Sequence, residues 1–272
     1  MRQPLIFAMR YRIRAKTGAL ARVLLIKLQN LCQNRAKIAL KMSLENDYPF
    51  RTVYNLYMDD SKRLKAGVIM NIVMVIFTVI GTFLMFTRTP EGGSLNASGI
   101  ENFKFYTVLS NVFCGFVSLI YLLIVLFKKD PDKIRGLKLA ALVGVMITFA
   151  VVAFMFGPLY GFLRFYKGGN LFFHLLLPLA ALFEFILYKW DWMPFRYAVF
   201  ATIPTVLYGI GYTLNILKNG VGGPWPDSND FYSFLSWGWK GGIIIFAAIV
   251  FLAFIIALVF RGINNKRARL KA

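Results

Sequence analysis

Thr107 and His174 are the two residues of this sequence whose side chains could together carry out acyl transfer. A threonine hydroxyl is a weak nucleophile until an adjacent base removes its proton, and imidazole is the usual base because its pKa is near neutral. His174 is the only histidine in the chain. Attack of Thr107 on an ester carbonyl would give an acyl-threonine, which water could discharge with the same imidazole as base. Glu184 follows His174 by ten residues, ~15 Å along a helix, so we interpret it as a structural polar contact.

This chemistry also needs hydrogen-bond donors for the developing oxyanion. The Asn111 amide, the Ser110 hydroxyl and a tyrosine such as Tyr160 are candidates, and the sequence does not choose among them. Asn170 lies four residues before His174, about one helical turn away, and is a candidate for orienting the imidazole ring.

The elements that must position these side chains are six long apolar segments. A helix of ~20 apolar residues can cross ~30 Å of hydrocarbon. Because 58% of the residues are hydrophobic and only 16% are charged, a soluble globular enzyme is excluded. Pro178 and Pro204 fall inside two segments, and a bundle tolerates them when neighbouring helices satisfy or shield the freed carbonyls. The predicted spans are residues 66–86, 106–127, 137–156, 171–188, 197–216 and 241–260.

The basic residues set the expected orientation of these spans. Most of the 32 Lys and Arg residues lie before the first span, in residues 128–138, in residues 189–196 or after the last span. Cytoplasmic loops retain Lys and Arg, so the formal charge of +20 indicates membrane topology, and nucleic-acid binding is not expected. The sequence therefore predicts an all-α membrane protein, a six-transmembrane-helix bundle with both termini cytoplasmic, in the plasma membrane.

The chain divides into a basic N-terminal extension, residues 1–60, and a six-span domain, residues 61–272. Residues 1–41 contain ten Lys or Arg residues and no acidic residue, with apolar residues interspersed. This pattern fits an amphipathic helix that binds anionic lipids of the inner leaflet. A poorly ordered extension, or a native start at Met42, is the alternative.

Polar residues at helical spacing predict which faces turn away from lipid. Four such residues form one stripe of the second span, and the fourth and fifth spans carry similar sets, so we expect these three spans to line a shared interior. The sixth span has no polar stripe and should lie at the lipid-exposed edge. Since the second and fourth spans both start from the outside, Thr107 and His174 should lie at similar depth in the outer leaflet. The stripe of the second span consists of Thr107, Ser110, Asn111 and Cys114.

Two short motifs carry a resemblance to a known family. The stretches FYTVLSN (residues 105–111) and NLFFHLLLP (residues 170–178), followed by Glu184, resemble the androgen-induced and androgen-dependent family of transmembrane threonine hydrolases. The similarity is closer to the uncharacterised bacterial six-span members, and it runs from about Ser61 through the sixth span.

The resemblance implies a function and two catalytic positions. The animal members hydrolyse fatty acid esters of hydroxy fatty acids with an intramembrane Thr and His, roles that fall on Thr107 and His174. Asn170 and Glu184 also match the spacing of the motif. Leu171 stands where the animal enzymes carry a second His.

The sequence thus favours a threonine-dependent hydrolase of lipophilic acyl esters that uses a Thr107/His174 dyad and no cofactor. Its expected partners are the lipid bilayer, a lipophilic ester and anionic inner-leaflet lipids. No HExxH motif, three-ligand metal set or GxxxxGK[ST] motif occurs, so we expect neither metal nor nucleotide chemistry. A transporter with His174 and Glu184 as a proton relay is one alternative, and a non-catalytic membrane scaffold is the other.

Overall fold

The computed structural model describes residues 50–87, 97, 99–188, 190–223 and 228–269. The described chain is helical, without a β-strand, and six of its helices are long and apolar enough to cross a membrane. The all-α architecture and the six predicted spans are therefore confirmed. The predicted amphipathic arm, residues 1–41, lies outside the described residues.

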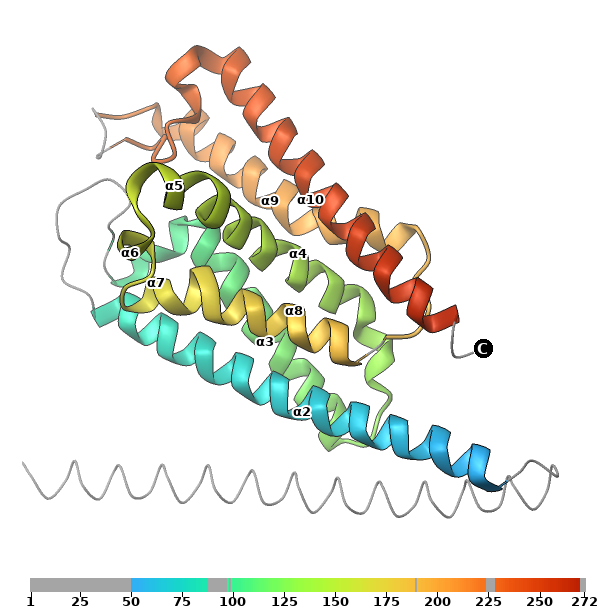
Figure 1. Cartoon of the computed structure of the whole chain (residues 1–272). Coiled ribbons are helices and arrows are strands. Elements are labelled where there is room, and N and C mark those ends of the chain that lie inside the picture. Colours follow the sequence, from blue (N-terminus) through green and yellow to red (C-terminus); the bar gives the residue numbers. More distant parts are fainter. Residues whose placement is uncertain (1–49, 88–96, 98, 189, 224–227, 270–272) are drawn as a thin grey trace, which may run out of the picture.

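The spans follow one another in a simple order (Figure 1). The first two are α2 (Phe50–Thr87) and α3 (Tyr106–Leu126), and the last two are α9 (Arg196–Asn219) and α10 (Gly238–Arg269). The third span is α4 (Arg135–Val151), continued by the π-helical segment η3 (Val152–Phe156) and by α5 (Gly157–Tyr160). The fourth span is α7 (Gly169–Leu171), the π-helical segment η4 (Phe172–Leu176) and α8 (Leu177–Tyr188). Short helices complete the chain: η1 (Gly99–Lys104), η2 (Pro131–Ile134), α6 (Phe162–Phe165) and η5 (Phe234–Trp237).

The bundle has two ends that differ in structure. We call the end that holds the start of α2 and the close of α10 the N/C end, and the opposite end the far end (Figure 1). The N/C end also contains η2 and residues 190–195, whereas the far end contains η1, α6 and the loop between α9 and α10. Residues 50–60, which we had assigned to the extension, form one continuous helix with the first span.

The third span occupies the centre of the bundle. α4 packs against α3, α8, α9 and α10, and Figure 1 shows it between the α2, α3 and α8 group and the α9 and α10 pair. Its small side chains allow this close approach, because Ala140, Ala141 and Gly144 bring its backbone near the neighbouring helices. Our expectation that the second, fourth and fifth spans line one shared interior was therefore wrong. It was based on polar stripes, whereas α4 is buried mainly through apolar residues, with small residues among them.

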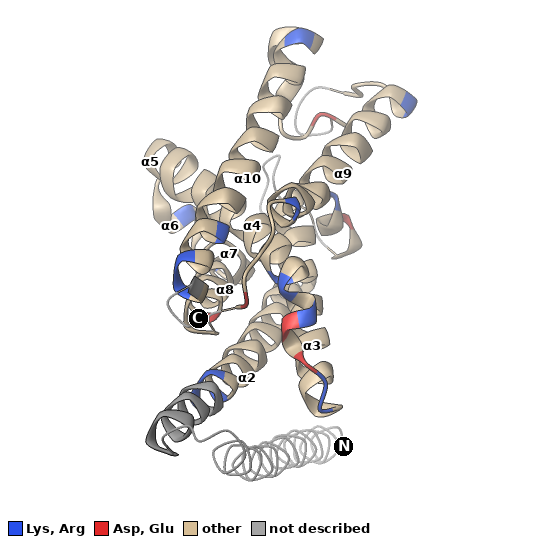
Figure 2. Cartoon of the chain, turned by 90° about the vertical axis from the view of Figure 1, so that its right-hand side faces the viewer, with Lys and Arg blue, Asp and Glu red and all other residues tan. Residues whose placement is uncertain are grey.

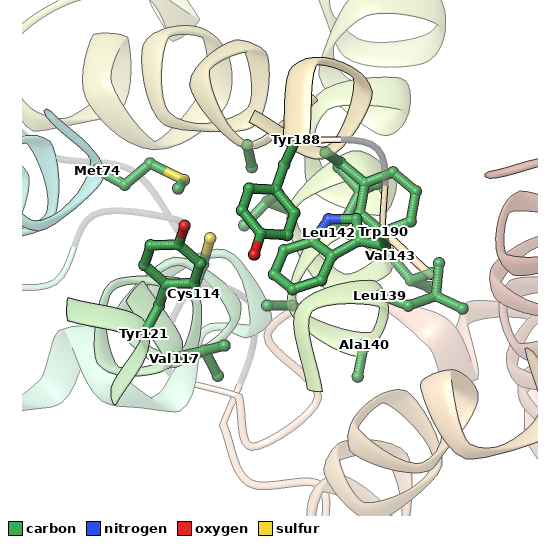
Figure 3. Close-up of a cluster of buried hydrophobic side chains, with 14 of the residues drawn as sticks. Met74, Cys114, Val117, Tyr121, Leu139, Ala140, Leu142, Val143, Tyr188 and Trp190 are labelled. Carbon is green, nitrogen blue, oxygen red and sulfur yellow. The ribbon is translucent and has the colours of Figure 1, made fainter. Parts of the chain in front are cut away.

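Aromatic and aliphatic side chains fill the core beside α4 (Figure 3). Tyr121, Tyr188 and Trp190 meet there, with the Tyr188 and Trp190 ring centroids 4.2 Å apart. Leu139 and Leu142 of α4 are fully buried against this group. Such rings bury large apolar areas, and their edge contacts add ~0.5–1.5 kcal/mol per pair.

The sixth span lies at the edge of the bundle, as its lack of polar residues predicted. Only 11% of its most apolar stretch is buried. Ala253 and Ala257 mark the narrow line along which α10 touches the other helices. The remaining apolar surface of α10 is left for lipid.

Candidate functional site

Two prolines shape the far ends of the third and fourth spans. Pro158 and Pro178 each stand at the second residue after a π-helical segment. The residue before each proline still donates across the wider π-helical turn, Gly157 to the Val152 carbonyl and Leu177 to the Phe172 carbonyl. Proline has no N–H with which to continue this ladder. π-helical turns are rare and often occur at functional sites.

Asn111 satisfies the carbonyl that Pro178 leaves free. The next bond of the π ladder would run from residue 178 to the Phe173 carbonyl, which instead accepts a hydrogen bond from Asn111 Nδ2 at 3.1 Å. The second hydrogen of the same amide goes to the Thr107 carbonyl at 2.7 Å. One buried amide therefore ties the helical turn that carries Thr107 to the residue before His174. This is the satisfaction by a neighbouring helix that an intramembrane proline requires.

Thr107 lies in the first turn of α3 with a half-buried side chain. Its carbonyl accepts hydrogen bonds from Asn111 Nδ2 and from Ser110 Oγ, the latter at 3.2 Å. No described residue forms a hydrogen bond with its hydroxyl. A threonine in a membrane helix usually bonds to its own backbone, so the Thr107 hydroxyl is more available than the residue type alone would suggest.

His174 occupies the middle of η4, and its side chain is 8% exposed. Its Nδ1 lies 2.9 Å from the Phe165 carbonyl oxygen. A carbonyl only accepts hydrogen bonds, so in the neutral ring Nδ1 carries the proton and Nε2 is the basic atom. Phe165 belongs to the short helix α6, which therefore fixes the tautomer and the tilt of the ring.

The structure places Thr107 and His174 on packed elements, since α3 contacts η4. Within the described chain no hydrogen bond joins the two side chains. Their connection runs through the Asn111 amide, which holds the Thr107 turn beside Phe173.

The proposed supporting residues lie in different surroundings. Ser110 is buried against α4, where its hydroxyl lies 3.3 Å from the Thr148 hydroxyl. Asn170 is half-buried in α7, and its backbone N–H donates to the Lys167 carbonyl. His174 is oriented by Phe165 rather than by Asn170 among the described residues. Tyr160 is 61% exposed, with its ring 6.1 Å from the Phe156 ring.

The hydrogen bonds of Asn111 decide whether its amide can stabilise an oxyanion. Both amide hydrogens of Asn111 are engaged by carbonyls, so this group has none left for an oxyanion in this conformation. Its Oδ1 atom is buried without a hydrogen-bond partner among the described residues. The contacts of Asn111 therefore suit it to hold the Thr107 turn in place.

Glu184 belongs to a separate polar cluster in the membrane, toward the N/C end. Its Oε1 accepts from Asn71 Nδ2 at 3.1 Å and lies 3.4 Å from Lys138 Nζ. Lys138 also donates to Asn71 Oδ1. All three side chains are at most 4% exposed. We had counted Lys138 among the loop cations, but it lies in α4 and neutralises Glu184 inside the bundle.

Several features of the candidate site could not be predicted from the sequence. Phe165 acts through its backbone carbonyl, for which no residue type gives a signal. The close packing of Gly81 under Phe173, where a Cβ would come within 2.4 Å of the ring, depends on the fold. Pro178, by contrast, stands four residues after His174 in the sequence, and this spacing could have predicted an altered helix at the histidine.

The loop between α9 and α10 braces the far end of α3. The Asp230 carboxylate accepts hydrogen bonds from the Tyr212 hydroxyl at 2.5 Å and from two backbone N–H groups of η5. The Tyr232 hydroxyl accepts from the Tyr106 N–H at the start of α3. Burial raises the pKa of the Tyr232 phenol to about 12, so this group remains neutral at physiological pH.

No group of three His, Cys, Asp or Glu side chains in the described part of the chain could hold a metal ion. No family model matches the chain, and comparisons with curated proteins and with solved structures gave no match.

Proposed function

We propose that this protein is an integral membrane hydrolase of lipophilic acyl esters, with Thr107 as nucleophile and His174 as general base. The observation that carries the proposal is the hydrogen bond of His174 Nδ1 to the Phe165 carbonyl. It leaves Nε2 as the basic nitrogen of a ring carried by η4, which packs against α3, the helix of Thr107. The resemblance of residues 105–111 and 170–178 to the transmembrane threonine hydrolases supports the same two roles.

The reaction has two steps. His174 Nε2 takes the proton of the Thr107 hydroxyl while Oγ1 forms a bond to the ester carbonyl carbon. The ester C–O bond then breaks, and the proton passes from the imidazolium to the leaving alkoxide. Water attacks the acyl-threonine with His174 again as base, which releases the fatty acid and restores Thr107. Catalytic hydrogen bonds are often long without substrate and shorten in its presence, so substrate must bring Thr107 Oγ1 to Nε2.

The charge distribution supports an orientation with the N/C end in the cytoplasm. Figure 2, viewed from that end, shows Lys and Arg on α2, on the segment after α3 and beside the C-terminus. Cytoplasmic ends are enriched in Lys and Arg. The dyad would then lie in the outer leaflet of the plasma membrane, and an ester could reach it laterally from the bilayer. Among the described residues, the cations at the N/C end include Lys128, Lys129, Lys133, Arg196, Arg261, Lys266 and Arg267, and those at the far end are Lys104, Arg164, Lys167, Lys218 and Lys240.

Transport is the second candidate function, favoured by the buried Lys138 and Glu184 pair. Ionisable residues inside a membrane bundle often mark ion or proton pathways. Within the described residues, however, the hydrogen bonds of Glu184 lead to Asn71 and Lys138 and not to His174. The hydrolase is therefore the function that the geometry supports better.

The test is hydrolysis of a long-chain fatty acid ester by the purified chain in lipid vesicles. Thr107→Val keeps the shape of the side chain but removes the hydroxyl, so hydrolysis should disappear. Thr107→Ser keeps a hydroxyl and should retain measurable activity. His174→Gln should lower the rate by about 10²- to 10⁴-fold, the range for loss of a general base.

Thr202→Val is the matched control, because the Thr202 hydroxyl bonds within its own helix, to the Val199 carbonyl. It should hydrolyse the ester at the wild-type rate. Equal rates in Thr107→Val and Thr202→Val would refute the assignment of the nucleophile. Proton-coupled solute uptake that disappears in Glu184→Gln would favour transport instead.

A further inference from the structure

An open cleft of about 520 Å³ lies between α3 and α9 at the far end of the bundle. This size falls within the usual range of ligand pockets, ~300–1,000 Å³. The cleft lies on a different face of α3 from the candidate dyad. Tyr106 faces α9, where its hydroxyl lies 2.9 Å from the Thr205 hydroxyl, and Leu109 lines the cleft one turn further on. Asn111 faces η4.

The cleft changes from polar to apolar along the direction of the bundle axis. Its outer part is lined by Lys104 and Asn215, at the far ends of the spans. Its deeper part is lined by Leu109 and Leu207, which are 39% and 62% exposed. Leu207 precedes Asn215 by eight residues, ~12 Å along α9. The two ends of the cleft are therefore separated by about the distance from a lipid headgroup to the upper part of its acyl chain.

Two side chains of the polar part, Lys104 and Asn215, can donate hydrogen bonds to a ligand. The Lys104 ammonium lies over the rings of Phe105 and Phe231, 5.4 and 5.5 Å from their centroids, and it forms no ion pair with a described carboxylate. The oxygen of the Asn215 side chain accepts from Asn219 Nδ2 at 2.8 Å. This leaves the Asn215 amide hydrogens free to donate.

The nearby carboxylate does not neutralise this part of the cleft. Asp230 is 5% exposed, and its two oxygens accept from the Tyr212 hydroxyl and from the backbone N–H groups of Phe234 and Leu235. The Tyr208 hydroxyl donates to the Lys104 carbonyl at 2.7 Å, which fixes the backbone of the lysine above the cleft. An anion with oxygen acceptors fits this arrangement.

Gly211 leaves space along the middle of the cleft. A Cβ built on Gly211 would meet no atom within 4 Å. An acyl chain could therefore pass over Gly211 between Leu109 and Leu207, where these side chains already face the hydrocarbon.

We propose that this cleft binds one anionic phospholipid of the adjoining leaflet. The phosphate oxygens contact the Lys104 ammonium and the Asn215 amide, and one acyl chain lies over Gly211 against Leu109 and Leu207. Lys104 supplies the preference for an anionic headgroup, and Gly211 supplies the room for the chain. The site is independent of the Thr107 and His174 dyad, and its test does not need enzymatic activity.

The test is native mass spectrometry of the full chain released from vesicles that contain equal amounts of phosphatidylglycerol and phosphatidylcholine. The wild type should retain one phosphatidylglycerol in preference to phosphatidylcholine. Gly211→Leu places its Cβ in open space and fills the cleft, and leucine suits a helix better than glycine, so the variant should fold and lose the bound lipid. Lys104→Gln should reduce the preference for phosphatidylglycerol about fivefold, the value expected for one cation at a membrane surface.

Two matched variants serve as controls for Gly211→Leu and Lys104→Gln. Gly262 in α10 is likewise in open space, so Gly262→Leu should retain the lipid. Lys240→Gln removes another cation of the far end and should leave the preference unchanged. The proposal is refuted if Gly211→Leu and Gly262→Leu retain equal amounts of lipid, or if Lys104→Gln has no more effect than Lys240→Gln. Displacement of the lipid by inorganic phosphate alone would also contradict it, because a free anion would then be the ligand.

Discussion

The two ends of the bundle use polar side chains in opposite ways. At the N/C end, side chains of α10 satisfy the backbone of the segment between α8 and α9: Asn265 bonds to both the N–H and the carbonyl of Met193, each at 2.8 Å. Asn264 Nδ2 donates to the Asp191 carbonyl at 3.0 Å. At the far end, the Thr107 hydroxyl has no hydrogen bond to a described residue, and a cleft with a polar outer part lies open between α3 and α9.

This contrast separates stability from function along the bundle axis. Buried polar groups that satisfy one another hold a single arrangement and leave nothing for a ligand. Polar groups that lack internal partners, together with interrupted helices such as η4, give a site that substrate can complete. Regions of low local stability commonly carry the parts that bind and move. Substitutions at the N/C end should therefore change mainly stability, and those at the far end should change activity in addition to any effect on stability.

The largest effect on stability is expected from the buried ionic cluster. Lys138→Ala would leave Glu184 charged and without its cation inside the bundle, which should lower the free energy of unfolding by about 3–5 kcal/mol. The measurement is the unfolding of purified protein in detergent. The double variant Lys138→Met/Glu184→Gln removes both charges and should recover most of the loss. A single variant as stable as the wild type would show that the cluster does not hold the helices together.

A smaller effect on stability is expected from the Asn265 contacts. Asn265→Ala leaves the buried N–H and carbonyl of Met193 without this partner and should cost about 1–3 kcal/mol. Ester hydrolysis at the far end should be unchanged in the protein that remains folded. Asn219→Ala, which breaks an exposed side-chain pair, should shift the unfolding transition far less. Comparable shifts in both variants would remove the distinction between the two ends.

Packing beneath the candidate site gives the third prediction. In Gly81→Ala the new methyl group would lie 2.4 Å from the nearest atom of the Phe173 ring, so Phe173 and the adjoining His174 must shift. We expect a loss of about 1–2 kcal/mol from overpacking together with a clear fall in hydrolysis. Gly262→Ala, in open space, is the control for both readouts. Normal hydrolysis in Gly81→Ala would mean that the position of His174 is not set by α2.

The smallest effect on stability, and the most specific one on function, is expected from Pro178→Ala. The new N–H can bond within the helix, and alanine is the best helix former, so the free energy of unfolding should stay equal or rise. Without the proline, residues 172–176 should return from π-helical to α-helical geometry, and His174 would rotate relative to Thr107. Hydrolysis should therefore fall while stability does not, which the initial rate and the unfolding midpoint of the same preparation would reveal. A variant with full activity would separate the π-helical turn from catalysis.

Much of this architecture could be predicted from sequence because the bilayer constrains it strongly. Each of the six apolar segments falls in a helix long and apolar enough to span a membrane. Of the predicted stripe, Ser110, Asn111 and Cys114 are buried and Thr107 is half-buried. The central position of α4 could not be predicted in this way, because an apolar helix without a polar stripe gives no direction. Its cluster of small residues was the remaining signal of close packing.

The candidate site was predictable in its residue types but not in its geometry. An intramembrane histidine is conspicuous in any sequence. Its tautomer depends on a backbone carbonyl of α6, and the role of Asn111 depends on the carbonyl that Pro178 frees. The Asn111 contact joins two segments that are far apart in the sequence, and the His174 contact involves irregular backbone. The spacing of residues along one helix predicts neither contact.

The most direct test of the Thr107 and His174 assignment is labelling of the purified protein by a fluorophosphonate probe, followed by mass spectrometry of the modified peptide. We expect the probe to modify Thr107, His174→Gln to lose the modification and Thr202→Val to keep it. Modification at another residue, or unchanged labelling of Thr107 in His174→Gln, would contradict the assignment of Thr107 and His174 as nucleophile and base.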